Sequence, residues 1–208
     1  MRPFSQNNLN LAKVAGAVSA SHELSEADLS KIEISGVTHS DTQVEPGDLF
    51  IAIPGANRHG AEFAMSAISK GAVAVLTDSA GAAQVKGVPV LVVADPRRVA
   101  GNVAALLYNE PMRDLASVGI TGTNGKTTVS TLIYQIFEAA GRDCGLIGTI
   151  ETRIGKDAID SSRTTPEATD LQALSAVMRE RHMRHLVMEV SSHAMVLHRM
   201  QGAHFAYV

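Results

Sequence analysis

The chain has 208 residues, of which 45% are hydrophobic and 19% charged, so it is long enough for two small globular domains. Its formal net charge of -3 argues against a general nucleic-acid binder, which is usually basic. A single cysteine, Cys144, excludes an internal disulfide and fits a reducing cytoplasm. The N-terminus lacks the apolar core of a signal peptide, and no stretch reaches the ~20 apolar residues that span a bilayer. We therefore expect a cytoplasmic protein without membrane insertion.

The first half of the sequence predicts a small α/β domain. Apolar and β-branched runs bounded by turn-forming residues predict strands, whereas helical periodicity with Gly71 as a stop signal and Pro96 as a start signal predicts helices. The expected helices cover residues 8–18, 61–72 and 96–109, and the expected strands cover residues 31–40, 47–55, 72–78 and 88–95.

A polar, proline-containing segment, "EPMRD" at residues 110–114, precedes a new strand pattern, and we place the domain boundary there, giving domains 1–112 and 113–208. The second domain is expected to alternate strands with helices, which is typical of a parallel sheet. Its strands are predicted at 117–121, 143–150 and 185–192, with a hairpin-like segment at 151–163 and a helix beginning near Thr165.

The stretch "SVGITGTNGKTTVSTLIYQIFEAAGR", residues 117–142, has the order strand, glycine-rich loop, helix that a phosphate-binding loop needs. Backbone N–H groups at a helix N-terminus bind phosphate oxygens, and the helix dipole adds to the attraction. Lys126 would reach the terminal phosphates, and the Thr127 hydroxyl would ligate Mg²⁺. Apolar residues at helical spacing predict the buried face of the helix: Val129, Leu132, Ile133, Ile136, Phe137 and Ala140.

The match to the standard loop is not complete, because Ile120 stands where its first glycine is expected and Gly122 follows two residues later. The alternative is a glycine turn between strand and helix with Lys126 merely solvated. Gly-Lys-Thr-Thr at a helix start, directly after a buried strand, favours nucleotide binding over that alternative.

The shortened loop "GTNGKTT" resembles the ATP loop of the Mur ligase family, which joins an amino acid or peptide to a carboxylate through an acyl phosphate. Three further stretches, "LIGTI", "TTPEATDLQAL" and "VMEVSSHAMVLHR", are similar to the branch that adds the third residue of the peptidoglycan stem peptide. The segment "VEPGDLFIAIPGANRHG" is similar to the uridine-binding domain of that branch. The resemblance runs from about Val37 to Val208 and implies a UDP-sugar-binding domain followed by part of a P-loop ATPase-type domain.

The resemblance also implies roles for individual residues. ATP and Mg²⁺ would be the cofactors, with Lys126 as the catalytic residue and Thr127 and Glu189 as metal ligands. The substrates would be UDP-MurNAc-L-Ala-D-Glu and an amino acid, diaminopimelate or lysine. The residues that match ATP contacts are Gly122, Thr123, Asn124, Gly125, Lys126, Thr127 and Thr128. Those that match UDP-MurNAc-dipeptide contacts are Ser40, Thr164, Thr165, Ser191 and Arg199, with Leu197 standing where a polar neighbour is expected.

Several of these residues have a purely structural alternative. One of the two threonines of "TTPE" could cap a helix, since threonine, proline and glutamate are common at helix starts. Glu189 could pair with Arg179, Arg181 or Arg184, and Arg199 could be an exposed loop residue. Asn57 and His59 could border the substrate or simply form a turn.

The family carries further segments beyond the last match, including a carbamylated lysine, adenine contacts and an amino-acid-binding domain. We therefore expect these 208 residues to be the N-terminal part of such a ligase, without ligase activity of their own. Two other readings stay open, a binding module for UDP-sugars or nucleotides and a sister ligase of the folylpolyglutamate type with another acceptor.

Overall fold

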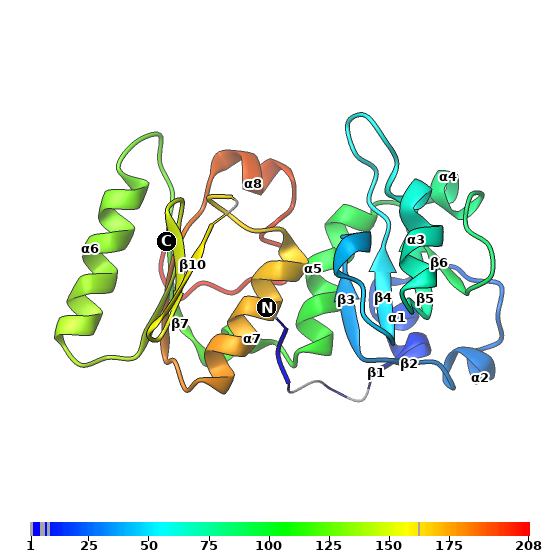
Figure 1. The fold of residues 1–208 in the computed structure, drawn as a ribbon, viewed down its shortest axis with the longest axis horizontal. Coiled ribbons are helices and arrows are strands. Elements are labelled where there is room, and N and C mark those ends of the chain that lie inside the picture. Colours follow the sequence, from blue (N-terminus) through cyan, green and yellow to red (C-terminus); the bar gives the residue numbers. More distant parts are fainter. Residues whose placement is uncertain (1, 5–6, 8, 162) are drawn as a thin grey trace. The chain divides into compact units, whose positions relative to one another are not determined.

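The computed structural model describes residues 2–4, 7, 9–161 and 163–208, and it divides into two compact units (Figure 1). The N-terminal unit ends at Asn109, and the C-terminal unit comprises Glu110–Val208 together with the described residues 2–4. Both are α/β, which confirms the expected fold class. Asn8 and Ser162, which belong to the predicted helix at 8–18 and the predicted hairpin at 151–163, lie outside the described residues.

The N-terminal unit contains a four-stranded parallel sheet in the order β3-β4-β5-β6. The two inner strands consist entirely of buried residues, as expected for strands covered on both faces. The predicted strand at 31–40 separates into two, because its first part pairs with β1 in a small antiparallel sheet. The strands are β1 Leu9–Asn10, β2 Glu33–Ile34, β3 Gly36–Thr38, β4 Asp48–Ile51, β5 Ala74–Thr77 and β6 Val90–Val92.

Two helices of this unit begin or end at signals identified in the sequence. Asp95 caps α5, its side chain accepting a hydrogen bond from the Arg98 N–H, and Pro96 is the first helical residue. Gly71 follows α3 with φ +105°, so the predicted stop is confirmed. The predicted helix at 61–72 starts as the 3₁₀ turn η2 and continues as α3. The helices are α1 Leu11–Val18, α2 Glu26–Leu29, η1 Asp41–Gln43, η2 Gly60–Phe63, α3 Ala64–Ser69, α4 Ser79–Ala82 and α5 Pro96–Leu107.

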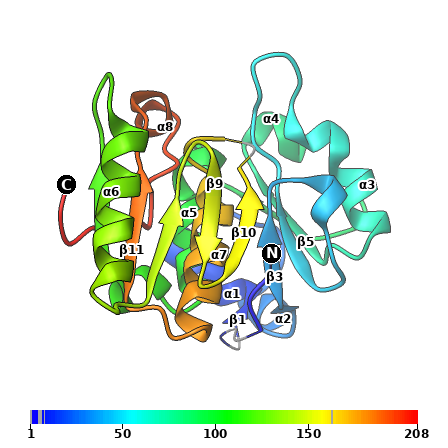
Figure 2. The same ribbon diagram turned by 60° about the vertical axis from the view of Figure 1, so that its left-hand side comes forward.

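The C-terminal unit is built on a five-stranded sheet in the order β10-β9-β8-β11-β7. Strands β7, β8 and β11 are parallel, and β9 and β10 form an antiparallel hairpin at one edge, as the segment 151–163 predicts (Figure 2). Beyond β7, Tyr207 forms a parallel bridge with Val118. The strands are β7 Ala116–Ile120, β8 Cys144–Ile147, β9 Glu151–Ile154, β10 Asp157–Asp160 and β11 His185–Glu189.

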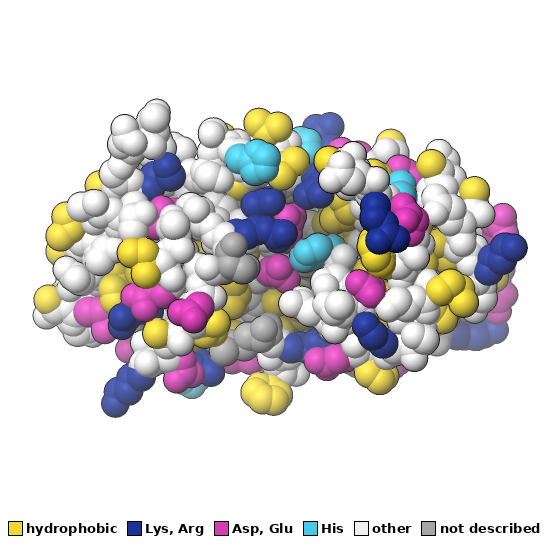
Figure 3. Space-filling model, turned by 45° about the horizontal axis from the view of Figure 1, so that its top comes forward, with side chains coloured by type: hydrophobic (Ala, Val, Ile, Leu, Met, Phe, Trp, Pro, Cys, Tyr) yellow, Lys and Arg dark blue, Asp and Glu magenta, His cyan; other side chains and the backbone are white. Residues whose placement is uncertain are grey.

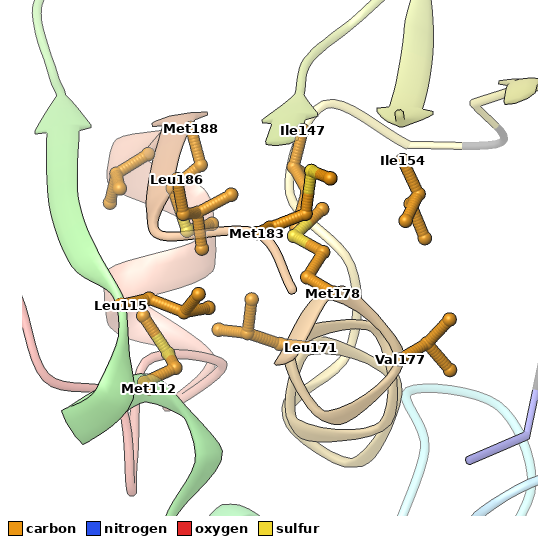
Figure 4. Packing of buried hydrophobic residues seen from close by; sticks show 11 residues of the cluster. Met112, Leu115, Ile147, Ile154, Leu171, Val177, Met178, Met183, Leu186 and Met188 are labelled. Carbon is orange, nitrogen blue, oxygen red and sulfur yellow. The ribbon is translucent and has the colours of Figure 1, made fainter. Parts of the chain in front are cut away.

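Helices α6 (Lys126–Ala139) and α7 (Ala168–Glu180) lie on opposite faces of this sheet (Figures 1 and 2). Alternate residues of β11 supply the two faces, as the period of a strand requires. Val187 packs on the α6 side with Tyr134, whereas Leu186 and Met188 belong to the core on the α7 side (Figure 4). Two short helices complete the unit, η3 Pro111–Asp114 and α8 Ser192–Val196.

The buried face of α6 differs from the predicted one. Ser130 and Tyr134 are the buried residues, with Ile133 and Phe137 partly buried beside them. Serine and tyrosine can occupy this face because the Ser130 hydroxyl donates to the Thr127 carbonyl, and the Tyr134 ring packs against the sheet. The prediction is therefore wrong for four of the six apolar residues, since Ala140 is exposed and three others are 43%, 53% and 67% exposed: Val129, Leu132 and Ile136.

Side chains of both charge signs are interspersed on the face shown in Figure 3, in keeping with the small net charge. Within the described part of the chain, none of the helices combines the length and apolar character that a bilayer crossing requires.

Candidate functional site

The glycine-rich loop connects the carboxyl end of β7 to the first turn of α6. Gly125 is the N-cap residue with φ +80°, and Gly122 has φ +144°, conformations that residues with a Cβ rarely adopt. Gly125 has no side chain with which to cap the helix, so the first amide groups of α6 are available to an anion. Thr123, Asn124 and Thr128 are exposed at the same end. The local geometry is that of a phosphate-binding loop.

Lys126 bends back over this loop rather than extending into solvent. Its Nζ donates to the Gly122 carbonyl at 2.7 Å and lies 3.5 Å from the Thr123 carbonyl. These neutral carbonyls hold the ammonium against the loop, close to the amide groups at the start of α6. An anion bound to those amides would therefore meet the positive charge of Lys126 at once.

Glu189 is the last residue of β11 and is only 1% exposed. Its carboxylate accepts hydrogen bonds from the Thr127 hydroxyl at 3.0 Å and from both the N–H and the hydroxyl of Thr149, at 2.9 and 3.0 Å. The structure thus places Glu189 beside the loop, at the carboxyl ends of the parallel strands where ligands of such sheets bind.

The arginine alternative for Glu189 is not what the structure shows. Arg179 pairs with Asp114 at 3.2 Å, and Arg181 pairs with Asp157. Among the described residues, the Glu189 side chain instead accepts hydrogen bonds from Thr127, in the first turn of α6, and from Thr149, which follows β8.

The helix expected near Thr165 begins at Ala168, with Glu167 as the N-cap residue. The predicted helix is thus present and begins slightly after Thr165, whereas the alternative in which Thr165 caps it is wrong because the Thr165 hydroxyl is used elsewhere. It donates to the Glu189 carbonyl at 3.0 Å and accepts from the Ser191 N–H at 3.1 Å, so it joins two loops instead of capping a helix. The residue before a proline also disfavours the helical conformation, in keeping with a helix that begins after Pro166.

Thr164 lies beside Thr149, their hydroxyl oxygens 3.1 Å apart, and Ser191 caps α8 by accepting from the Ala194 N–H. The two predicted substrate threonines therefore face different partners, Thr164 toward Thr149 and Thr165 toward Ser191.

Arg199 is buried rather than an exposed loop residue. It is 9% exposed, its Nη1 donates to the Thr165 carbonyl at 3.1 Å, and its Nη2 lies 2.9 Å from Glu167 Oε1. Its buried Nε has no hydrogen-bond partner among the described residues. In this conformation Arg199 therefore fixes the backbone of Thr165, and one of its donors is unused.

Ser40 lies in the N-terminal unit, just beyond β3, whereas the other predicted site residues lie in the C-terminal unit. Its hydroxyl is 2.8 Å from the Thr42 hydroxyl, and its N–H donates to Thr38 Oγ1. His59, from the same unit, caps η2 through Nδ1, and its Nε2 lies 3.1 Å from Asp78. His59 thus has a structural role as a turn-forming residue.

The donors at Glu189 and Thr127 fit a magnesium ion only in part. Among the described residues, no group of three histidine, cysteine, aspartate or glutamate side chains could hold a metal. Mg²⁺ is commonly bound by one or two carboxylates while phosphate oxygens and waters complete its shell. One buried carboxylate and one hydroxyl beside a phosphate loop therefore fit Mg²⁺ bound together with a nucleotide.

The site as a whole is one chain of polar contacts that runs from Thr127 through Glu189 to Thr165, Ser191 and Arg199. Sequence reasoning missed Thr149, although it is part of the quoted stretch "LIGTI" and follows β8 at the carboxyl end of the sheet. A polar residue at that position was a signal that could have found it.

Comparison with known proteins shows which family the chain belongs to. A profile described as the catalytic domain of the Mur ligase family matches residues 33–116, and one described as the Mur ligase middle domain matches residues 120–208. The chain is therefore a member of the Mur ligase family, whose two matched domains correspond to the two halves of the sequence.

Particular members are similar over nearly the whole chain. The UDP-N-acetylmuramoyl-L-alanyl-D-glutamate–2,6-diaminopimelate ligase of Streptomyces avermitilis is 52% identical over 206 residues, which are 98% of this chain and 40% of that protein. The UDP-N-acetylmuramyl-tripeptide synthetase of Leifsonia xyli is 47% identical over 180 residues, 86% of this chain and 35% of that protein. The chain thus spans about two fifths of the length of the curated relatives it matches.

Solved structures agree on the fold. A UDP-N-acetylmuramoyl-L-alanyl-D-glutamate–2,6-diaminopimelate ligase superposes with a TM-score of 0.74 at 22% identity, covering 95% of this chain and 39% of that one. The MurF ligase of Thermotoga maritima in complex with ADP superposes with a TM-score of 0.52 at 18% identity, covering 82% and 35%.

Proposed function

We propose that this chain forms the UDP-sugar-binding and ATP-binding part of a cytoplasmic ligase that adds 2,6-diaminopimelate to UDP-MurNAc-L-Ala-D-Glu during peptidoglycan synthesis. The observation that carries the proposal is the pairing of Thr127 with Glu189 at the start of α6. It joins a phosphate loop to a buried carboxylate at the carboxyl ends of the parallel strands. The similarity to ligases named for diaminopimelate supports the choice of that amino acid over lysine.

The reaction would proceed in two steps. The γ-carboxylate of D-glutamate attacks the γ-phosphorus of ATP, forming an acyl phosphate and releasing ADP. An amine of diaminopimelate then attacks the acyl carbon, forming the amide bond and releasing inorganic phosphate. Positioning and charge neutralisation supply most of the catalysis in phosphoryl transfer.

Within this scheme, the loop Gly122–Thr128 would hold the triphosphate on its backbone amides. Lys126 would exchange the Gly122 carbonyl for phosphate oxygens and offset the charge that develops on them. Thr127 and Glu189 would hold Mg²⁺, which supplies further charge neutralisation when it is bound.

On the acceptor side, Ser40 would contact the uridine part of the substrate, and Thr164, Thr165 and Ser191 would contact the muramoyl-dipeptide. Arg199 would act mainly by holding the backbone of Thr165 in place, since its Nη atoms are engaged with Thr165 and Glu167. Its free Nε is the donor that a substrate carboxylate could take after a small movement.

Calorimetric titration tests the acceptor assignment. UDP-MurNAc-L-Ala-D-Glu is titrated into the chain, with UDP-MurNAc-L-Ala as the matched ligand that lacks the reacting residue. The proposal predicts saturable binding of the first and weaker binding of the second. A chain that circular dichroism shows to be folded but that releases no heat with either ligand would contradict the acceptor assignment and favour a sister ligase.

A further inference from the structure

We propose that Gly148 and Thr149, at the end of β8, are the positioning element of the Glu189 carboxylate, and that they determine how Thr127 meets a divalent cation. The inference rests on the proposed function, because the cation is the one that would accompany ATP. No role for either residue follows from the loop motif itself.

Thr149 directs two donors at one side chain. Its N–H donates to Glu189 Oε1 at 2.9 Å, and its hydroxyl donates to Glu189 Oε2 at 3.0 Å. Two hydrogen bonds to different oxygens of one carboxylate fix both the position and the rotation of that group. Because Thr149 itself is exposed whereas Glu189 is 1% exposed, these bonds do not arise from core packing.

Gly148 leaves the space that this carboxylate occupies. A Cβ at position 148 would lie 2.8 Å from Glu189 Oε1, closer than carbon and oxygen approach without displacement. At the end of β8, Gly148 thus allows the Glu189 carboxylate to approach closely, and Thr149 donates hydrogen bonds to it.

The orientation of Glu189 has a consequence for Thr127. The Thr127 hydroxyl donates its single proton to Glu189 Oε2, so its remaining lone pairs are free for a cation. Oε2 accepts from two hydroxyls, those of Thr127 and Thr149. If Glu189 rotated, Thr127 would lose the acceptor that orients it.

The same element leads toward the acceptor side. The Thr149 hydroxyl also lies 3.1 Å from Thr164 Oγ1, a second acceptor within reach of its single proton besides Glu189. Thr149 thus links Glu189, which is proposed to hold the metal, to Thr164, which is proposed to contact the substrate.

The test separates metal-dependent from metal-independent nucleotide binding. ATP is titrated into the 208-residue chain with Mg²⁺ and, separately, with EDTA, and the ratio of the two dissociation constants gives the gain from the metal. Thr149→Val is expected to reduce this gain by about tenfold, the lower end of the effect of groups that orient metal ligands. Affinity in EDTA should stay unchanged, and Thr149→Ser should restore the gain.

Two further variants sharpen the result. Gly148→Ala keeps both donors of Thr149 but displaces the carboxylate, so it should also reduce the gain. Thr131→Val, on α6 and outside this network, is the matched control and should leave it unchanged. A full metal-dependent gain in both Thr149→Val and Gly148→Ala would overturn the proposal.

A second measurement does not depend on nucleotide. In a double-mutant cycle, Thr149→Val and Glu189→Met are compared singly and together by urea unfolding of the chain without ligand. A non-zero coupling is expected, and additive effects would overturn the positioning role. If wild-type chain shows no metal-dependent gain but the coupling is present, the proposed function fails while the positioning of Glu189 stands.

Discussion

Arg199 Nη2 lies 2.9 Å from Glu167 Oε1, and both side chains are only 10% exposed. The pair ties the segment after α8 to the N-terminus of α7, and Arg199 also donates to the Thr165 carbonyl. Arg163 approaches the same carboxylate oxygen at 3.4 Å, but its side chain is 50% exposed. The two arginines therefore offer a matched comparison of a buried and an exposed partner of one glutamate.

We predict that Arg199→Ala lowers the free energy of unfolding by about 3 kcal/mol, because it leaves a buried carboxylate without its main partner. Arg163→Ala should cost less than about 1 kcal/mol, as is usual for exposed ion pairs. Urea unfolding followed by circular dichroism measures both. Equal effects of the two substitutions would show that burial does not determine the strength of this contact.

The two glycines that flank α6 provide a test of the loop. Gly125 and Gly141 both have positive φ, and a Cβ at either would meet no atom within 4 Å. Each change to alanine should therefore cost about 1–2 kcal/mol of stability through backbone strain alone. Only Gly125→Ala should also weaken ATP binding, since only Gly125 shapes the phosphate loop. Calorimetry would contradict the loop assignment if Gly141→Ala weakened binding equally.

Cys144 makes stability depend on pH at the alkaline end. Burial, with a smaller effect of the nearby Glu138 charge, raises the pKa of its thiol from 9.0 to about 12. The folded state thus retains a proton that the unfolded state loses, and the free energy of unfolding should fall as pH rises from 9 toward 12. Urea unfolding at several pH values should show that the free energy of unfolding falls less steeply with pH in Cys144→Ala than in the wild type. Identical slopes would mean that the thiol is accessible.

The apolar residues Val129, Leu132 and Ile136 of α6 are exposed, whereas the apolar periodicity predicts that they are buried and important for stability. Leu132 is 53% exposed, so Leu132→Gln should change the free energy of unfolding by no more than about 0.5 kcal/mol. Tyr134, 7% exposed in the same helix, should cost about 3 kcal/mol or more on change to alanine. A large loss for Leu132→Gln would place that residue in the core after all.

The difference at α6 shows what periodicity could and could not supply. Six apolar residues at helical spacing identified the helix and its approximate extent. The face that is buried is rotated by roughly a quarter turn from their centre, because Ser130 and Tyr134 pack against the sheet while Val129, Leu132 and Ile136 do not. A pattern of hydrophobicity cannot show which flank of a wide apolar face the sheet covers.

The site shows a similar division. The glycine-rich loop was predictable because strand, glycines and helix are adjacent in the sequence, and Glu189 because it ends a strand and belongs to a stretch that resembles the Mur ligase family. The contacts of Thr165 and Thr149 were not, since they join Thr165 to Ser191 and Thr149 to Glu189 across long separations in the chain. Such contacts depend on the strand order, in which β11 lies between β7 and β8.

Binding of Mg·ATP to the loop is the central claim, and calorimetric titration of Lys126→Ala tests it most directly. Lys156, exposed in the turn between β9 and β10, gives the matched control Lys156→Ala. We predict that wild type and Lys156→Ala bind alike and that Lys126→Ala binds at least about tenfold more weakly, since a hydrogen bond to a charged group contributes about 1.5–3 kcal/mol. Equal binding by Lys126→Ala, or no binding by a folded wild-type chain, would contradict it.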